Sequence, residues 1–121
     1  LHIPYTKENH HLVDEKLIKK MKKEAFLINT SRGGIVDEKA LAKMVRDKKI
    51  AGAGLDVFEN EPPKEGNPLF DVKRVILSPH SAALTKESSS RMALHAAQGV
   101  ADVLKGKKPK WVFNIDRIKL G

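Results

Sequence analysis

Three separate segments carry an arginine, a carboxylate and a histidine, the side chains that proton transfer on an anionic substrate requires. Arg32 lies in Asn-Thr-Ser-Arg-Gly-Gly, Glu61 precedes two prolines, and His80 follows a proline. A guanidinium group has a planar fork that suits a carboxylate or a phosphate. An imidazole exchanges protons near neutral pH, and a neighbouring carboxylate would orient it. We therefore predict that Arg32, Glu61 and His80 are catalytic residues.

The hydrophobic pattern predicts the elements that position these side chains. Short apolar runs indicate three strands and the end of an earlier one: residues 25–29, 50–57, 74–77 and 1–4. Three helices are predicted from the residues that would cap them: Asp14, Asp37 and Thr85, the last helix reaching about Leu104. Alternating strands and helices favour an α/β fold, a parallel sheet with flanking helices covering both faces. Ligands of such sheets bind beyond the carboxyl ends of the strands, where all three candidate residues fall.

Each candidate residue also has an ordinary structural explanation. An arginine in a glycine-rich turn is more often a surface residue. An acid before prolines usually ends a solvated loop, and a histidine after a proline is more often a turn residue. The joint placement of the three at consecutive strand ends is what favours a shared site.

Composition restricts the class of protein. Of 121 residues, 40% are hydrophobic and 31% charged, which is typical of a globular domain. The apolar runs are too short for a membrane-spanning helix, and we expect neither a membrane association nor a secretion signal. The chain has no cysteine, which fits a reducing compartment, and we expect a cytoplasmic protein. The formal charge of +8 favours anionic partners.

Four strings occur in order along the chain: LHIPYTKENHHL, FLINTSRGGIVDEKAL, AGAGLDVFENEPP and VILSPHSAALTKES. Together they resemble the D-isomer-specific 2-hydroxyacid dehydrogenase family, in its phosphoglycerate dehydrogenase and hydroxypyruvate or glyoxylate reductase branch. The resemblance covers nearly the whole chain, and the spacing of Arg32, Glu61 and His80 is typical of the family. It implies the second half of a Rossmann-type domain over residues 1–105, including the long helix 85–105. Residues 106–121 would lead back to a substrate domain.

The resemblance also implies roles for individual residues. Arg32 would bind the substrate carboxylate and polarise the reacting carbonyl, His80 would carry the proton, and Glu61 would hydrogen-bond to His80. Asp56 would meet the nicotinamide carboxamide. The other implied cofactor-lining residues are Ile3, Pro4, Thr30, Ser31, Ala82 and Ala83, together with Arg32 and His80. The implied reaction is hydride transfer between NAD, or NADP, and a 2-hydroxy or 2-keto acid.

The same resemblance implies that the glycine-rich phosphate-binding turn and most of the substrate domain precede Leu1. We therefore expect the isolated chain to be inactive, or nearly so. The pair Gly52 and Gly54 does not supply that turn, because it lies within a strand, and close strand–helix packing explains it better. Family members are commonly dimers through this domain, and a half-sheet exposes its edge, so we expect a homodimer.

The main alternative is a non-catalytic module of the same fold that senses NAD or binds a nucleic acid or another partner. The chain has five lysines predicted on one helix and its end: Lys16, Lys19, Lys20, Lys22 and Lys23. They could neutralise phosphates, but few aromatic residues lie among them, so nucleic acid is not favoured as a partner. The adjacent His10 and His11 cannot face one ion from a helix, and we expect no metal site.

Overall fold

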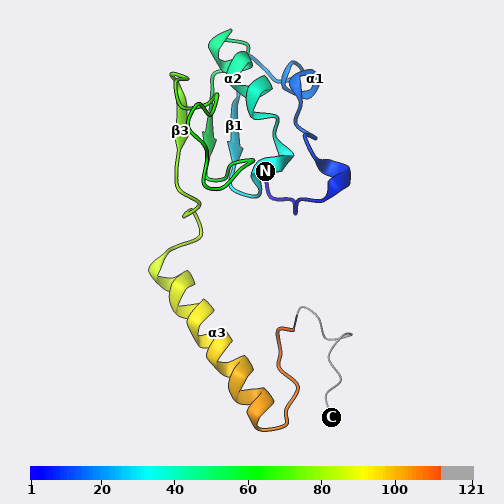
Figure 1. Cartoon of the computed structure of the whole chain (residues 1–121), viewed down its shortest axis with the longest axis vertical. Helices are drawn as coiled ribbons and strands as arrows, with labels where there is room; N and C mark the ends of the chain where they lie inside the picture. Colours follow the sequence, from blue (N-terminus) through cyan, green and yellow to red (C-terminus); the bar gives the residue numbers. More distant parts are fainter. Residues whose placement is uncertain (113–121) are drawn as a thin grey trace. The chain divides into compact units, whose positions relative to one another are not determined.

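The computed structural model describes residues 1–112, and the chain divides into two compact units. The first unit, Leu1–Ala82, contains three strands, two α-helices and two short 3₁₀ helices (Figure 1). In chain order these are η1 (Lys7–Asn9), α1 (Glu15–Ile18), β1 (Phe26–Asn29), η2 (Gly33–Ile35), α2 (Glu38–Arg46), β2 (Gly52–Leu55) and β3 (Val75–Leu77). The second unit begins at Ala83 and contains α3 (Lys86–Leu104).

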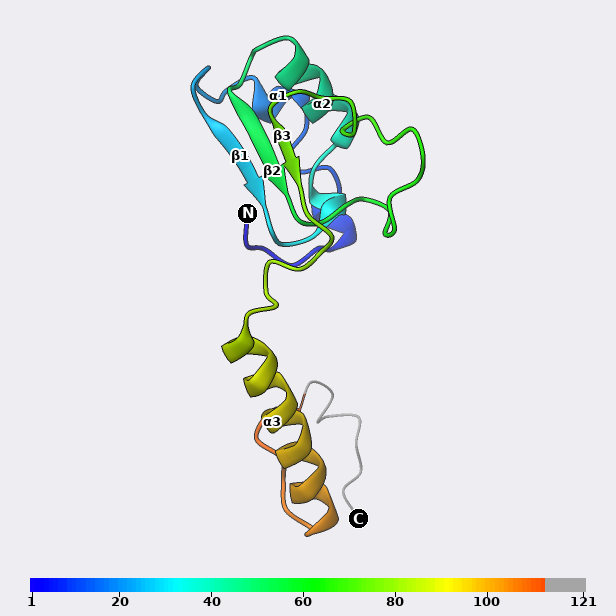
Figure 2. The same cartoon turned by 90° about the vertical axis from the view of Figure 1, so that its left-hand side faces the viewer.

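The three strands form a parallel sheet in the order β1-β2-β3 (Figure 2). Leu27 pairs with Ala53, and Leu55 pairs with Leu77, so the three strands end at one common edge. The prediction of a parallel sheet with flanking helices is thereby confirmed. The second strand is shorter than predicted, although the N–H groups of Ala51 and Asp56, just outside it, still bond to the carbonyls of Ala25 and Asn29.

One face of the sheet forms the core with both helices. Leu27 and Leu55 are buried against Ile18 of α1 and against Leu41 and Met44 of α2. Both helices begin where they were predicted to begin: the carboxylate of Asp14 accepts the N–H of Leu17, and that of Asp37 accepts the N–H of Ala40. Each such cap contributes about 1 kcal/mol to stability.

The opposite face of the sheet carries no helix of the first unit, and the expectation that helices cover both faces stays a prediction. Phe26, Ile28 and Ile76 point to this face and are 59%, 52% and 77% exposed. The glycines of β2 also face this side. A Cβ on Gly52 would lie 2.4 Å from the carbonyl oxygen of Arg74, so neighbouring strands, rather than a helix, account for this glycine.

Two further expectations about the first unit are wrong. Residues 1–4 are not a strand: the Leu1 nitrogen donates one hydrogen bond to the oxygen of Ile28, and no ladder follows. The helix capped by Asp14 ends at Ile18, because beyond Lys19 the N–H groups of Lys20 and Met21 bond to carbonyls only three residues back. The lysines beyond Ile18 therefore lie outside the helix.

In the second unit, α3 begins at its predicted cap, where the hydroxyl of Thr85 accepts the N–H of Ser88. The ring of Trp111 stacks on that of His95 with centroids 3.9 Å apart, so Trp111 packs against this helix. Across residues 1–112, no helix has both the length and the apolar character needed to cross a membrane. Most of the predicted tail, residues 113–121, lies outside the described residues.

Candidate active site

The turn after β1 is organised by Asn29, whose side chain is completely buried. Its Oδ1 accepts hydrogen bonds from the N–H and the hydroxyl of Ser31, and its Nδ2 donates to the carbonyl of Arg32. These bonds fix the backbone of the segment that carries Arg32. Our reading of the sequence did not assign this role to Asn29, although an asparagine that opens a turn is a recognisable signal.

The turn after β1 also rests directly on the loop after β2. Gly33 is buried, and a Cβ at this position would stand 1.9 Å from the carbonyl carbon of Phe58. Only glycine allows two backbones to approach this closely. The segment of Arg32 and the segment of Glu61 are therefore held against each other by backbone contact.

The loop after β2 is tied to the segment after β3 by Asp56, which is buried. Its Oδ1 accepts from the Ser78 hydroxyl and the Ser81 N–H, and its Oδ2 accepts from the Ala82 N–H. The hydrogen bond from Ser78 lowers the pKa of Asp56 and burial opposes it. The bonds from Ala82 and Ser81, with the charge of His80, leave this pKa below its ordinary value. Asp56 thus fixes the turn that presents His80.

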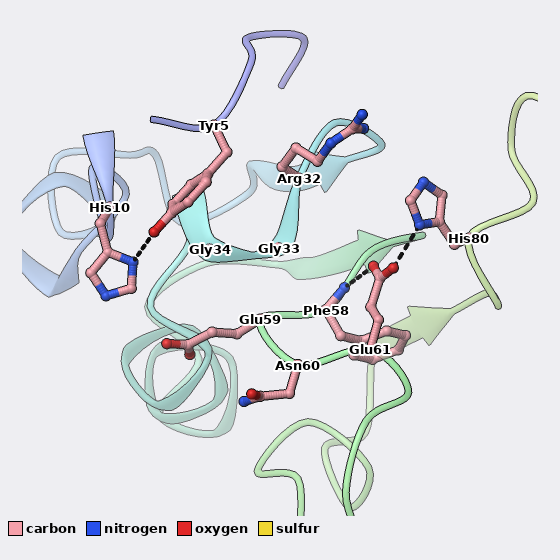
Figure 3. A pocket seen from close by; sticks show the side chains of 10 residues that line it. All are labelled: Tyr5, His10, Arg32, Gly33, Gly34, Phe58, Glu59, Asn60, Glu61 and His80. Atoms are coloured by element: carbon pink, nitrogen blue, oxygen red, sulfur yellow. Dashed lines mark hydrogen bonds and ion pairs between the residues drawn. The ribbon is translucent and has the colours of Figure 1, made fainter. Parts of the chain in front are cut away.

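Glu61 and His80 form a hydrogen-bonded pair within this arrangement. The Oε2 of Glu61 lies 2.7 Å from the Nδ1 of His80, and its Oε1 accepts the N–H of Phe58 at 3.0 Å. His80 has a φ of 52°, in the left-handed region that few residues other than glycine adopt. With Nδ1 engaged, the Nε2 of His80 faces away from Glu61 (Figure 3).

The electrostatic balance at Glu61 favours its charged form. Partial burial raises the pKa of this carboxyl, but the hydrogen bonds from His80 and Phe58 and the charges of His80 and Arg32 outweigh burial. The net result is a pKa below the ordinary value of 4.5. At neutral pH an ionised Glu61 therefore accepts a hydrogen bond from the Nδ1–H of His80.

All three predicted catalytic residues line one cavity of about 520 Å³. Arg32 lies across this cavity from the Glu61–His80 pair (Figure 3). One guanidinium nitrogen, Nη1, donates to the carbonyl of Ser31 at 2.7 Å, and the side chain is otherwise exposed. The cavity thus presents a fixed cation on one side and an imidazole on the other, which suits an anion that gains or loses a proton.

Five of the predicted cofactor-lining residues share a second cavity of about 540 Å³: Ile3, Pro4, Thr30, Ser31 and Arg32. Arg32 lines both cavities, so the two adjoin at this residue. Asp56 and Ala82 lie outside both linings and bond to each other. Ala83 belongs to the second unit.

Glu38 supports the site without belonging to the cavity that contains Arg32, Glu61 and His80, and our sequence reading missed it. Only 5% exposed, it lies in the first turn of α2. Its Oε1 accepts the N–H of Glu59, and its Oε2 accepts the side-chain amide of Asn67, both at 2.8 Å. In the sequence, Glu38 cannot be told apart from the many acidic residues that stabilise the first turn of a helix. Its burial is visible only in the structure.

His10 and His11 lie with Glu59 at the same side of the site, their possible ligand atoms within 4.8 Å of one another. The Nε2 of His11 bonds to Glu59 at 2.9 Å, and the two rings are stacked with planes 24° apart. Lone pairs in nearly parallel rings do not converge on one ion. The expectation that this pair binds no metal stays a prediction.

Comparison with known proteins agrees with this geometry. The sequence profile of the D-isomer specific 2-hydroxyacid dehydrogenase NAD binding domain matches residues 1–82. The chain is 47% identical to a glyoxylate reductase of Thermofilum pendens over 99% of its own length and 35% of that protein. It is 41% identical to a D-3-phosphoglycerate dehydrogenase of Methanocaldococcus jannaschii over 100% of its length and 24% of that protein.

Among solved structures, D-lactate dehydrogenase with NAD+ from Lactobacillus jensenii superposes with a TM-score of 0.86 at 30% identity. The match covers 94% of this chain and 38% of that protein. The chain therefore spans between 24% and 38% of the length of the relatives named here. It belongs to the D-isomer specific 2-hydroxyacid dehydrogenase family, as part of the NAD binding domain.

Proposed function

We propose that this chain supplies the anion-binding and proton-transfer residues of an NAD(P)-dependent oxidoreductase acting on 2-keto and D-2-hydroxy acids. The observation that carries the proposal is the 2.7 Å bond between Glu61 and His80 in the cavity that also contains Arg32. The relatives act, by their names, on glyoxylate and on D-3-phosphoglycerate. Both compounds are small carboxylic acids, and in a 2-keto or 2-hydroxy acid the reacting carbon is bonded directly to the carboxylate.

The proposed roles follow from charge and geometry. Bound nicotinamide supplies or accepts the hydride. Arg32 pairs with the substrate carboxylate and places positive charge beside the carbonyl oxygen, where negative charge develops. His80 donates a proton from Nε2 to that oxygen in reduction and removes it in oxidation. Glu61 holds the other ring nitrogen, which orients the imidazole.

The second cavity fits the nicotinamide end of the cofactor. Ile3 and Pro4 give it an apolar wall, Thr30 and Ser31 add polar groups, and Arg32 links it to the substrate cavity. A planar ring in this cavity would lie next to a substrate bound in the first one. In this proposal Asp56, His80, Ala82 and Ala83 complete the cofactor contacts, and the cofactor is NAD or NADP.

The proposal extends to the organisation of the whole protein. Residues 1–105 form part of the NAD-binding domain, and residues 106–121 lead back to a substrate domain. We propose a homodimer, because the sheet leaves β1 and β3 as edge strands that favour pairing with another chain. The absence of cysteine supports a cytoplasmic location.

The test is an assay of the polypeptide as its gene encodes it, following NADH or NADPH consumption with glyoxylate and with hydroxypyruvate. We expect reduction of at least one acid, and we expect His80→Ala to lower kcat by about 10²–10⁴-fold. His95→Ala is the matched control, because His95 lies on α3 and should leave kcat unchanged. An unchanged rate in His80→Ala would contradict the assigned role, and a failure to reduce any 2-keto acid would favour a non-catalytic NAD-binding function.

A further inference from the structure

A pair of basic residues lies just before each strand of the sheet. The pairs are Lys22 and Lys23 before β1, Lys48 and Lys49 before β2, and Lys73 and Arg74 before β3. Because the strands are parallel, their amino ends share one edge, opposite the edge that carries the candidate active site. The topology therefore gathers six cations that are far apart in the sequence, and all six residues are exposed.

These cations lack partners within residues 1–112. None of the six side chains makes a hydrogen bond or an ion pair there, whereas Lys19 and Lys43 both pair with Glu15. Three acids lie within two residues of these pairs along the chain: Glu24, Asp47 and Asp71. The positive charge at this edge therefore exceeds the negative charge, and the like charges repel one another in the absence of a counter-anion.

One member of each pair lines a cavity of about 430 Å³: Lys23, Lys48 and Arg74. Glu24 is the one acid in the lining, and the remaining wall is apolar, from Phe26, Ile50 and Ala51. Lys48 and Arg74 have φ angles of 54° and 72°, in the left-handed region that favours glycine. Long cationic residues thus occupy backbone positions where glycine would be less strained.

We propose that this cavity binds an anion with two or more linked phosphate groups. Lysine ammonium groups bind phosphate as point charges, and a guanidinium group can bind two phosphate oxygens at once. Three cations from three loops match the charge of a di- or triphosphate, whereas a single phosphate carries less charge than the three together. Both a free oligophosphate and a nucleic acid backbone carry linked phosphates, and we favour the free oligophosphate because the three cations line one cavity of about 430 Å³.

The test is a calorimetric and NMR titration of the 121-residue chain with inorganic tripolyphosphate in buffer of near-physiological ionic strength. We expect saturable binding, with the largest amide shifts at Lys23, Lys48 and Arg74. The triple variant Lys23→Gln/Lys48→Gln/Arg74→Gln should bind at least about tenfold more weakly. Lys23→Gln alone should weaken binding about threefold, which keeps the test valid if the triple variant does not fold.

The matched control removes the same charge elsewhere in the first unit. We expect Lys16→Gln/Lys39→Gln/Lys64→Gln, three other exposed lysines, to change the affinity by less than about twofold. Equal weakening in both triple variants would overturn the proposal, because binding would then reflect net charge alone. Absence of binding, or orthophosphate binding as tightly as tripolyphosphate, would overturn it as well. Binding of a single-stranded oligonucleotide through the same three residues, without binding of tripolyphosphate, would also overturn the proposal.

Discussion

Gly33 and Phe58 touch backbone to backbone, so closely that a Cβ on Gly33 would stand 1.9 Å from the carbonyl carbon of Phe58. Arg32 precedes this glycine, and Glu61 follows three residues after the phenylalanine and bonds to its N–H. The contact therefore fixes the separation between the cation and the carboxylate of the candidate site. This separation cannot change without a shift of one of the two loops.

Gly33→Ala should destabilise the first unit. Because the atoms nearest to the new methyl group are backbone atoms of Phe58 and Glu59, one loop must move, at a cost of about 1–3 kcal/mol. The measurement is denaturant unfolding followed by circular dichroism. Gly99→Ala on α3 is the control, since a Cβ there meets nothing within 4 Å, and it should be neutral or stabilising by up to about 1 kcal/mol. Equal stability of Gly33→Ala and the unchanged chain would contradict the close contact.

Glu38→Gln should destabilise the loop that carries Glu61. Both carboxylate oxygens of Glu38 accept hydrogen bonds, so the amide nitrogen of glutamine would face a donor, either the N–H of Glu59 or the amide of Asn67. Asn67 cannot turn its amide around freely, because its oxygen accepts the N–H of Leu69. We expect a loss of about 1–3 kcal/mol in the free energy of unfolding. Glu65→Gln, at an exposed position, should change it by less than about 0.5 kcal/mol.

Acid should destabilise the chain in part through Asp56. Its pKa in the folded chain lies below the ordinary value of 3.8, so in this range the unfolded chain binds more protons than the folded one. The stabilisation from Asp56 is therefore present above the unfolded pKa and is lost as the pH falls through the folded pKa. Asp56→Asn should lower the free energy of unfolding at neutral pH. In the acid range, the free energy of unfolding of this variant should depend less on pH than that of the unchanged chain.

The measurement for Asp56 is the free energy of unfolding between about pH 6 and pH 2, a range that spans the ordinary carboxyl values. Asp71→Asn is the control, since the Asp71 side chain makes no hydrogen bond within residues 1–112. We expect Asp71→Asn to leave the pH dependence of the free energy of unfolding unchanged. If Asp56→Asn and the unchanged chain lost stability in parallel on acidification, the three hydrogen bonds at Asp56 would not be the cause.

Glu61→Gln should slow the proposed reaction by acting through His80. Glutamine keeps the shape of the side chain but removes the charge that holds the imidazole through its Nδ1. We expect a fall in kcat of about 10²-fold in the gene's full polypeptide. Since the two residues work as a unit, Glu61→Gln/His80→Ala should be no slower than His80→Ala alone. Additive losses would show that Glu61 and His80 act separately.

Much of the fold was predictable because the signals are local. Asp14, Asp37 and Thr85 begin helices as expected, since a cap needs only a side-chain oxygen within the next turn. The apolar runs around Leu27, Ala53 and Ile76 become strands for a similarly local reason. The helix after Asp14 was overestimated at its end, where a switch to tighter hydrogen bonding stops it at Ile18. Such an end depends on backbone geometry that the apolar pattern does not encode.

The sequence by itself determined which side chains reach the carboxyl edge, because strand ends and chemical residues can be read from one string. Arg32, Glu61 and His80 were chosen in this way, and the structure places them in one cavity. The tertiary structure alone decided how they are held. The contacts that hold them join segments distant in the chain: Gly33 meets Phe58, Glu38 bonds to the N–H of Glu59, and Asp56 bonds to the turn of His80. The burial and the backbone hydrogen bonds arise only when those segments meet, so no local pattern specifies them.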